Sequence, residues 1–136
     1  MKAAFGLAVL VCTLLIGVAV WGQTGDEYQA IMKSNAAMVA DLTKNLMAKN
    51  ASGAIMDTNT LQENMSKTMI YWQIRKVSDA LKFASDSREG FSGVAILVNQ
   101  GKFDEAAAAA KMVQANCGGC HMAHRDKQAD GSFKIK

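Results

Sequence analysis

The chain has 136 residues, 50% of them hydrophobic, and a formal charge of +3, which suits one domain with one core. So small a charge gives no indication of nucleic acid binding, and none is expected. The sequence contains no proline and no long alternation of apolar and polar residues, so it predicts an all-α domain.

The N-terminal residues have the pattern of a secretory signal. A basic start precedes an uncharged apolar run over residues 3–20, and small residues lie before an expected cleavage after Gly22. We therefore predict a signal peptide over residues 1–22 and a mature domain over residues 23–136, located in the periplasm or otherwise exported. The alternative is an uncleaved anchor, because a membrane helix needs only roughly 17–20 apolar residues. Contact with a membrane is expected only in that case.

Breaker residues divide the mature chain into four predicted helices. Thr24 or Gly25 is expected to precede the first helix, and residues 50–59 are expected to form a connection. The polar tail beyond Gly131 is expected to be frayed. Four helices with short links predict an antiparallel, up-down-up-down four-helix bundle. We expect the helices over residues 26–49, 60–85, 88–99 and 103–127.

Near the end of the last predicted helix, Cys117, Cys120 and His121 form a Cys-x-x-Cys-His motif. This motif is the attachment signature of c-type haem: each thiol adds across a vinyl group of the porphyrin, and the imidazole becomes the proximal ligand of the iron. Spacings of three and four residues place the three side chains on one helix face. The sequence therefore predicts one covalent haem c, with its iron bound by His121.

Two other interpretations of the cysteine pair stay open. Cys117, Cys120, His121 and His124 could together bind zinc, although ligands so close on one helix surround a tetrahedral ion poorly. A thiol–disulfide enzyme usually has its Cys-x-x-Cys pair at a helix N-terminus, where the helix dipole lowers a thiol pKa. Here the pair lies near a predicted helix C-terminus, so haem attachment is the favoured interpretation.

Two longer strings of residues carry further information, one that begins at the motif and one in the first predicted helix. Residues 117–125 continue from Cys-x-x-Cys-His through two residues to His124 and Arg125. Residues 29–38 contain Gln-x-x-Met ending at Met32, then Asn-Ala, then a second Met. Together these strings resemble class II c-type cytochromes, the cytochrome c′ family, which typically has an aromatic residue in place of His124 and Asn-Gly in place of Asn-Ala. The resemblance covers essentially the whole mature chain.

The resemblance implies a four-helix bundle with covalent haem near the end of its last helix, and a protein that is not an enzyme. In the low-spin type of the family, a Met on the first helix is the sixth iron ligand, and the protein carries single electrons between redox partner proteins; Met32 matches that position. In the high-spin type, the sixth position is empty and binds small gases such as nitric oxide. The resemblance also implies a homodimer formed through the first two helices. Arg125 is expected to contact a propionate or a backbone carbonyl of the pocket, and the alternative is a solvated cation near a helix C-terminus.

Core packing is the competing interpretation of Met32, because methionine fills bundle cores readily. The sequence contains 9 Met, and we interpret Met65, Met69 and Met112 as core residues. The string around Met32 favours iron ligation at that position. The first hypothesis is therefore an electron carrier with Met32 as distal ligand, and the alternative is a five-coordinate gas-binding cytochrome c′.

Overall fold

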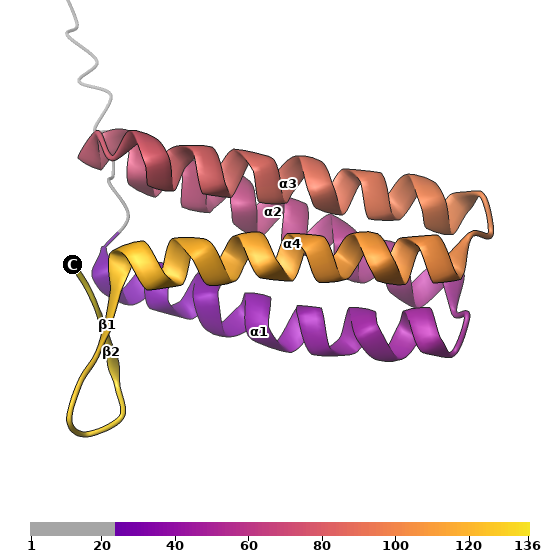
Figure 1. Cartoon of the computed structure of the whole chain (residues 1–136), viewed down its shortest axis with the longest axis horizontal. Helices are drawn as coiled ribbons and strands as arrows, with labels where there is room; N and C mark the ends of the chain where they lie inside the picture. The colour runs from indigo at the N-terminus through magenta and orange to yellow at the C-terminus, as the bar shows by residue number, and fades with distance from the viewer. Residues whose placement is uncertain (1–23) are drawn as a thin grey trace, which may run out of the picture.

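Four helices run back and forth along one long axis, consecutive helices are antiparallel, and a short β-hairpin follows the last helix (Figure 1). This computed structural model describes residues 24–136, so the predicted signal peptide over residues 1–22 lies outside the described residues. The all-α prediction with four helices is confirmed, apart from the small two-stranded sheet. Within residues 24–136, none of the helices combines the length and the apolar character that spanning a bilayer requires. The elements are α1 (Gly25–Met47), α2 (Ala51–Arg75), α3 (Ser78–Asn99), α4 (Phe103–His124), β1 (Arg125–Lys127) and β2 (Phe133–Ile135).

The first helix begins close to the predicted residue, because Thr24 forms a capping box with Glu27. Glu27 N donates to Thr24 Oγ1 at 3.2 Å, and Thr24 N donates to the Glu27 carboxylate at 2.7 Å. These bonds satisfy backbone N–H groups that have no partner inside the helix. The cap fixes where α1 starts, and with it the position of Met32 about two turns further along.

The predicted connection over residues 50–59 is wrong, because α2 begins at Ala51. Asn50 is the cap, and its side-chain oxygen accepts a hydrogen bond from Gly53 N at 3.2 Å. The sequence contains two clusters of residues that can cap a helix, one at Asn50 and one at residues 58–60. The structure uses the first cluster, and the added turns of α2 bury Ala54 in the larger core cluster.

The single helix predicted over residues 60–85 is instead divided between α2 and α3. The break lies at Lys76, which has a left-handed backbone with φ of 58°, and at Val77. No glycine or proline occurs at this turn, so breaker residues do not reveal it. As a consequence α3 begins at Ser78 rather than at residue 88, and it has 22 residues, as many as α4 beside it (Figure 1).

The C-terminal tail forms a hairpin instead of fraying, and α4 ends at His124 rather than at residue 127. Arg125 already has an extended backbone and pairs with Ile135 on the antiparallel strand β2. Gly131 supplies the positive φ of 84° in the connecting turn. Lys136 N donates to His124 O at 3.0 Å, which returns the end of the chain to the end of α4.

The interior contains two hydrophobic clusters, and Met32 packs against both. Of the methionines predicted as core residues, Met65 is buried, whereas Met112 is 75% exposed and that prediction is wrong. Ala110 and Val113 occupy the inward positions of that turn of α4, so Met112 faces outward. The larger cluster includes Leu42, Leu61, Phe91, Val94 and Val98. The smaller cluster consists of Tyr28, Tyr71, Trp72 and Ala80.

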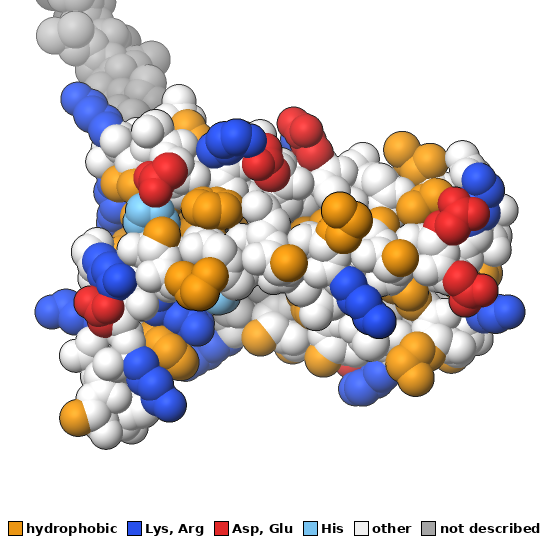
Figure 2. All heavy atoms as spheres, in the orientation of Figure 1, with side chains coloured by type: hydrophobic (Ala, Val, Ile, Leu, Met, Phe, Trp, Pro, Cys, Tyr) orange, Lys and Arg blue, Asp and Glu red, His pale blue; other side chains and the backbone are white. Residues whose placement is uncertain are grey.

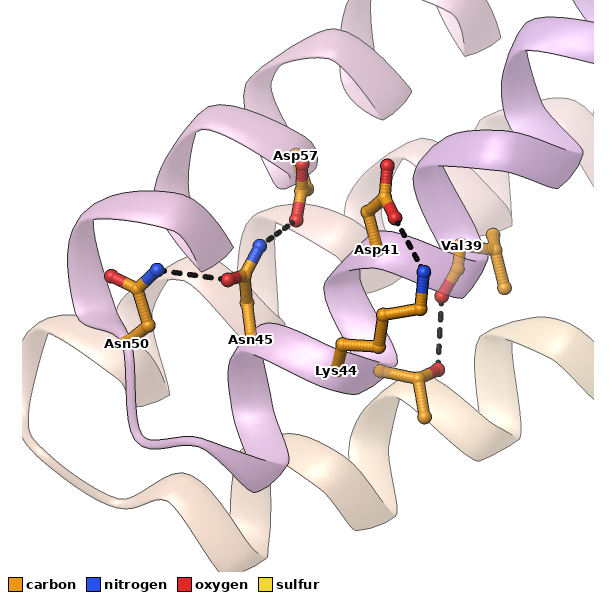
Figure 3. A network of polar contacts seen from close by, with 7 residues as sticks. Val39, Asp41, Lys44, Asn45, Asn50 and Asp57 are labelled. Carbon is orange, nitrogen blue, oxygen red and sulfur yellow. Dashed lines mark hydrogen bonds and ion pairs between the residues drawn. The ribbon is translucent and has the colours of Figure 1, made fainter.

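A network of polar side chains fixes the turn between α1 and α2, at the end of the bundle opposite to the hairpin. Asn45 lies between Asn50 and Asp57 in Figure 3. Its Nδ2 donates to Asp57 Oδ2 at 2.7 Å, and its Oδ1 accepts from Asn50 Nδ2 at 2.8 Å. Asp57 is buried, so the bond from Asn45 offsets part of the cost of removing its side chain from water, and the bond from Asn50 holds Asn45 in place.

Candidate functional site

The bundle is least tightly closed between α1 and α4, which contact each other less than the other three adjacent helix pairs do. A cavity of about 400 Å³ lies along this seam, at the end of the bundle where α1 begins and α4 ends. Its walls come from both helices, from Trp72 on α2 and from the hairpin. Small-molecule sites have volumes of roughly 300–1,000 Å³, so the cavity is large enough to be one.

Four of the five predicted site residues line this cavity: Met32 from α1, Cys120 and His121 from α4, and Arg125 from β1. Cys117 lines an adjoining cavity of about 30 Å³, whose walls also include Met32, Cys120 and His121. The fold therefore brings all five residues to one end of the bundle. The thioether comes from a different helix than the thiols and the imidazole. Ligation by Met32 and covalent attachment to the thiols stay predictions.

Both thiols of the motif are free and partly buried. Cys117 Sγ lies 3.8 Å from Ser87 Oγ on α3. Burial raises the pKa of Cys117, and burial together with the negative charges of ionised Cys117 and Asp79 raises the pKa of Cys120 to about 11. Both thiols are therefore protonated at neutral pH, which disfavours the thiol–disulfide interpretation because that chemistry needs a thiolate.

Asn116 holds this part of α4 against α3. Its Nδ2 donates to Ser87 Oγ at 2.7 Å and to Phe83 O at 2.8 Å. Gly119 permits the same close approach, because a Cβ atom at this position would lie 3.1 Å from the Phe83 ring. The α3 contacts thus fix the backbone that carries the two thiols, and the sequence pattern around the motif gives no sign of them.

His121 is partly buried and lines both cavities. Burial lowers the pKa of its imidazole, and the neighbouring Arg125 cation lowers it further. The imidazole is therefore neutral at pH 7, which is the form that binds a metal. Two thiols, one neutral imidazole and one thioether at a cavity form a donor set that fits a c-type haem.

Met32 lies between the two cavities and is partly buried. Asn35, one turn further along α1, directs its side-chain Nδ2 at the thioether, and the distance from Nδ2 to Met32 Sδ is 4.0 Å. Asn35 is buried, and its Oδ1 is the one buried side-chain acceptor of residues 24–136 that has no hydrogen-bond partner. The buried, unpartnered Oδ1 of Asn35 therefore carries a desolvation cost, beside the residue predicted to bind iron.

Aromatic side chains form the inner wall of the larger cavity. Tyr28 stacks on Tyr71 with 4.0 Å between ring centroids, and Trp72 Nε1 donates to the Tyr28 hydroxyl at 3.2 Å. His124 lines the cavity as well, 5.3 Å from the Trp72 ring, and its Nε2 lies 2.9 Å from Asp79 Oδ2. These contacts join the first turn of α1 to the ends of α2, α3 and α4.

The sequence pattern does not reveal the outer wall of the cavity. Phe133, Lys134 and Ile135 on β2 line it, and so does Lys33 on α1. The only local signal for the hairpin is an apolar–polar–apolar triplet after Asp-Gly, and three residues are too few to indicate a strand.

Among residues 24–136, no three His, Cys, Asp or Glu side chains converge as a ligand set for a metal ion. The zinc interpretation of the two cysteines and two histidines therefore has no geometric support. Comparisons with protein-family models, with curated proteins and with solved structures found no match to this chain.

Proposed function

We propose that this chain is an exported, monohaem c-type cytochrome that carries single electrons between redox partner proteins in the periplasm. The observation that carries the proposal is the meeting of Cys120, His121 and Met32 at one cavity, with Cys117 beside it. The first two lie on α4 and Met32 on α1, so donor atoms reach the seam from both sides. The proposal assigns no catalytic residue.

Each residue of the site has a definite role in this proposal. The Cys117 and Cys120 thiols would hold the porphyrin through two thioether bonds, each S–H adding across one vinyl C=C. When bound, haem supplies an iron centre that gains and loses one electron. The neutral His121 imidazole would be the proximal ligand, and the soft Met32 thioether would favour the reduced iron. Arg125, which lines the same cavity, would pair with a propionate.

The second candidate is a five-coordinate cytochrome c′ that binds small gases such as nitric oxide. The packing of Met32 against both hydrophobic clusters favours it, because a side chain held by the core has less freedom to approach iron. In that case Met32 would form an apolar wall beside the open sixth position.

The visible spectrum of the purified protein, recorded oxidised and reduced, tests both candidates. The carrier predicts low-spin ferric bands with a weak charge-transfer band from the Met sulfur to iron, and this band is lost on changing Met32→Ala. High-spin bands, with tight carbon monoxide binding by the reduced protein, would replace the carrier by the gas-binding candidate. The Cys117→Ser/Cys120→Ser variant is the control, because it has no covalent haem. Colourless wild-type protein from cells that mature c-type cytochromes would refute both candidates.

We further propose that two copies pair through α1 and α2, as the resemblance implies. Both helices have large hydrophobic side chains on the surface: Met47 on α1, and Met56, Ile70 and Ile74 on α2. Met56, Ile70 and Ile74 share one face of α2, since four residues separate the last two and about four turns separate Met56 from Ile70.

A further inference from the structure

The cavity at the α1–α4 seam has a charge pattern that its donor atoms do not explain. Lys33 on α1, Arg125 on β1 and Lys134 on β2 line it, and no Asp or Glu among residues 24–136 does. None of the three forms an ion pair within the same range. Three like charges around one cavity repel each other, so they favour a ligand that is apolar in its body and anionic at its edge.

The hairpin that carries two of these cations is held against the bundle. Ile135 packs against the smaller cluster, which contains Tyr28 and Trp72. The Arg125 guanidinium lies 3.7 Å above the centre of the Phe133 ring, so β1 and β2 are joined by a side-chain contact as well as by backbone pairing. Lys136 N donates to His124 O at 3.0 Å, which fixes the far end of β2. The backbone of Lys134 is therefore part of a fixed wall of the cavity.

We propose that Lys134, together with Lys33 from the α1 wall, binds a carboxylate arm of the haem, and that the C-terminal hairpin is a part of the cofactor site. This inference rests on the proposed haem attachment. The two carboxylate arms of haem lie on the half of the ring opposite to its vinyl groups, so attachment at Cys117 and Cys120 directs the arms away from those thiols. Lys33 and Lys134 add two cations to the propionate contact expected for Arg125.

Lys127 provides a matched control for Lys134. It lies on β1 of the same hairpin, pairs in register with Phe133, is exposed, and does not line the cavity. Figure 2 shows several Lys and Arg side chains on the hairpin and the adjoining end of the bundle, so a general effect of positive charge has to be separated from binding at one position. A Lys→Gln change at each position removes the same charge from the same hairpin.

The experiment compares haem-loaded wild-type protein with Lys134→Gln, Lys134→Arg, Lys33→Gln and Lys127→Gln. The midpoint potential is measured by spectroelectrochemical titration, and hydrogen exchange of residues 125–136 is measured by mass spectrometry. We expect Lys134→Gln and Lys33→Gln to lower the potential, because a nearby cation stabilises the reduced state. We expect Lys134→Gln also to speed exchange in the hairpin, since an anchor to the cofactor is lost. Lys134→Arg keeps both properties close to those of wild type.

The outcomes separate this inference from the proposed function. The inference is overturned when wild-type protein contains covalent haem but Lys134→Gln and Lys127→Gln change potential and exchange by equal amounts, because the effect is then one of overall charge. In that case the proposed haem attachment still stands, because the wild-type protein contains covalent haem. Wild-type protein without covalent haem overturns both.

Discussion

The contact between Asn35 and Met32 allows iron ligation by Met32 to be tested with a single substitution. An amide N–H that points at a thioether draws electron density from sulfur, which weakens its bond to ferric more than to ferrous iron. The 4.0 Å distance from Nδ2 to Sδ is at the long end for a hydrogen bond to sulfur, so a modest effect is expected. A neutral hydrogen bond contributes about 0.5–1.5 kcal/mol, and we expect the contact from Asn35 to sulfur to lie in the lower part of this range.

Changing Asn35→Leu should lower the midpoint potential by about 20–40 mV, which is the equivalent of about 0.5–1 kcal/mol for one electron. It should also shift the charge-transfer band from sulfur to iron. The free energy of unfolding should not fall, because the change removes a buried Oδ1 that has no partner. Spectroelectrochemistry and urea unfolding measure the two quantities.

Asn64→Leu is the control for this prediction. Asn64 is also buried, but its Nδ2 donates to Ser34 Oγ and not to sulfur. It should leave the potential unchanged and reduce stability. Equal potentials in wild type and Asn35→Leu, with the charge-transfer band present in both, would show that the Asn35 contact does not act on the sulfur.

At the scale of helices, α3 contains two glycines whose surroundings differ sharply. A methyl group added at Gly90 would overlap Cγ2 of Val113 on α4, and the stiff, branched side chain of Val113 has little freedom to move aside. A methyl group added at Gly93, one turn further on, would meet no atom within 4 Å. The first glycine is therefore needed for the α3–α4 packing, and the second only weakens the helix.

We expect Gly90→Ala to lower the free energy of unfolding by about 1–3 kcal/mol through overpacking, and Gly93→Ala to raise it by up to about 1 kcal/mol through helix propensity. Urea unfolding followed by circular dichroism gives both values, and each variant controls for the other. Equal effects of the two changes would contradict the close approach of α3 to α4 at Gly90.

The helix boundaries and the hairpin show which parts of the fold can be predicted from the sequence. The start of α1 follows from a local signal, the capping box of Thr24 with Glu27. The count of four helices agrees with the structure, but the break predicted between residues 85 and 88 lies inside α3. The turn at Lys76 does not follow from a local signal, because a lysine carries no breaker signal and takes a left-handed backbone only under tertiary constraint. Similarly, the Cys-x-x-Cys-His motif is local and visible in the sequence. Lys134, by contrast, reaches the cavity through the tertiary packing of the hairpin, in which Ile135 contacts the cluster of rings from α1 and α2.

For the whole molecule, the proposed pairing through α1 and α2 depends on the exposed face of α2. Ile70 is 49% exposed and Ile74 is 44% exposed, one turn apart, and the Lys67–Glu63 ion pair adjoins them. Burying each isoleucine in an interface is favourable by about 0.8–1.5 kcal/mol, half of the value for a fully exposed side chain, since both are already half covered. A pair of lysines at these positions would place like charges at the interface and remove that gain.

Ile70→Lys/Ile74→Lys should therefore raise the dissociation constant of the dimer at least about 100-fold, which corresponds to about 2.7 kcal/mol. Sedimentation velocity over a range of protein concentrations measures this change. Ile96→Lys is the matched control, because Ile96 is 56% exposed but lies on α3, outside the proposed interface. The proposed interface on α2 would be contradicted by a wild-type protein that sediments as a monomer at every concentration. It would also be contradicted by a control variant that dissociates as readily as the double variant. Retention of the haem spectrum in the double variant would show that its fold is intact, so that loss of the dimer reports on the interface alone.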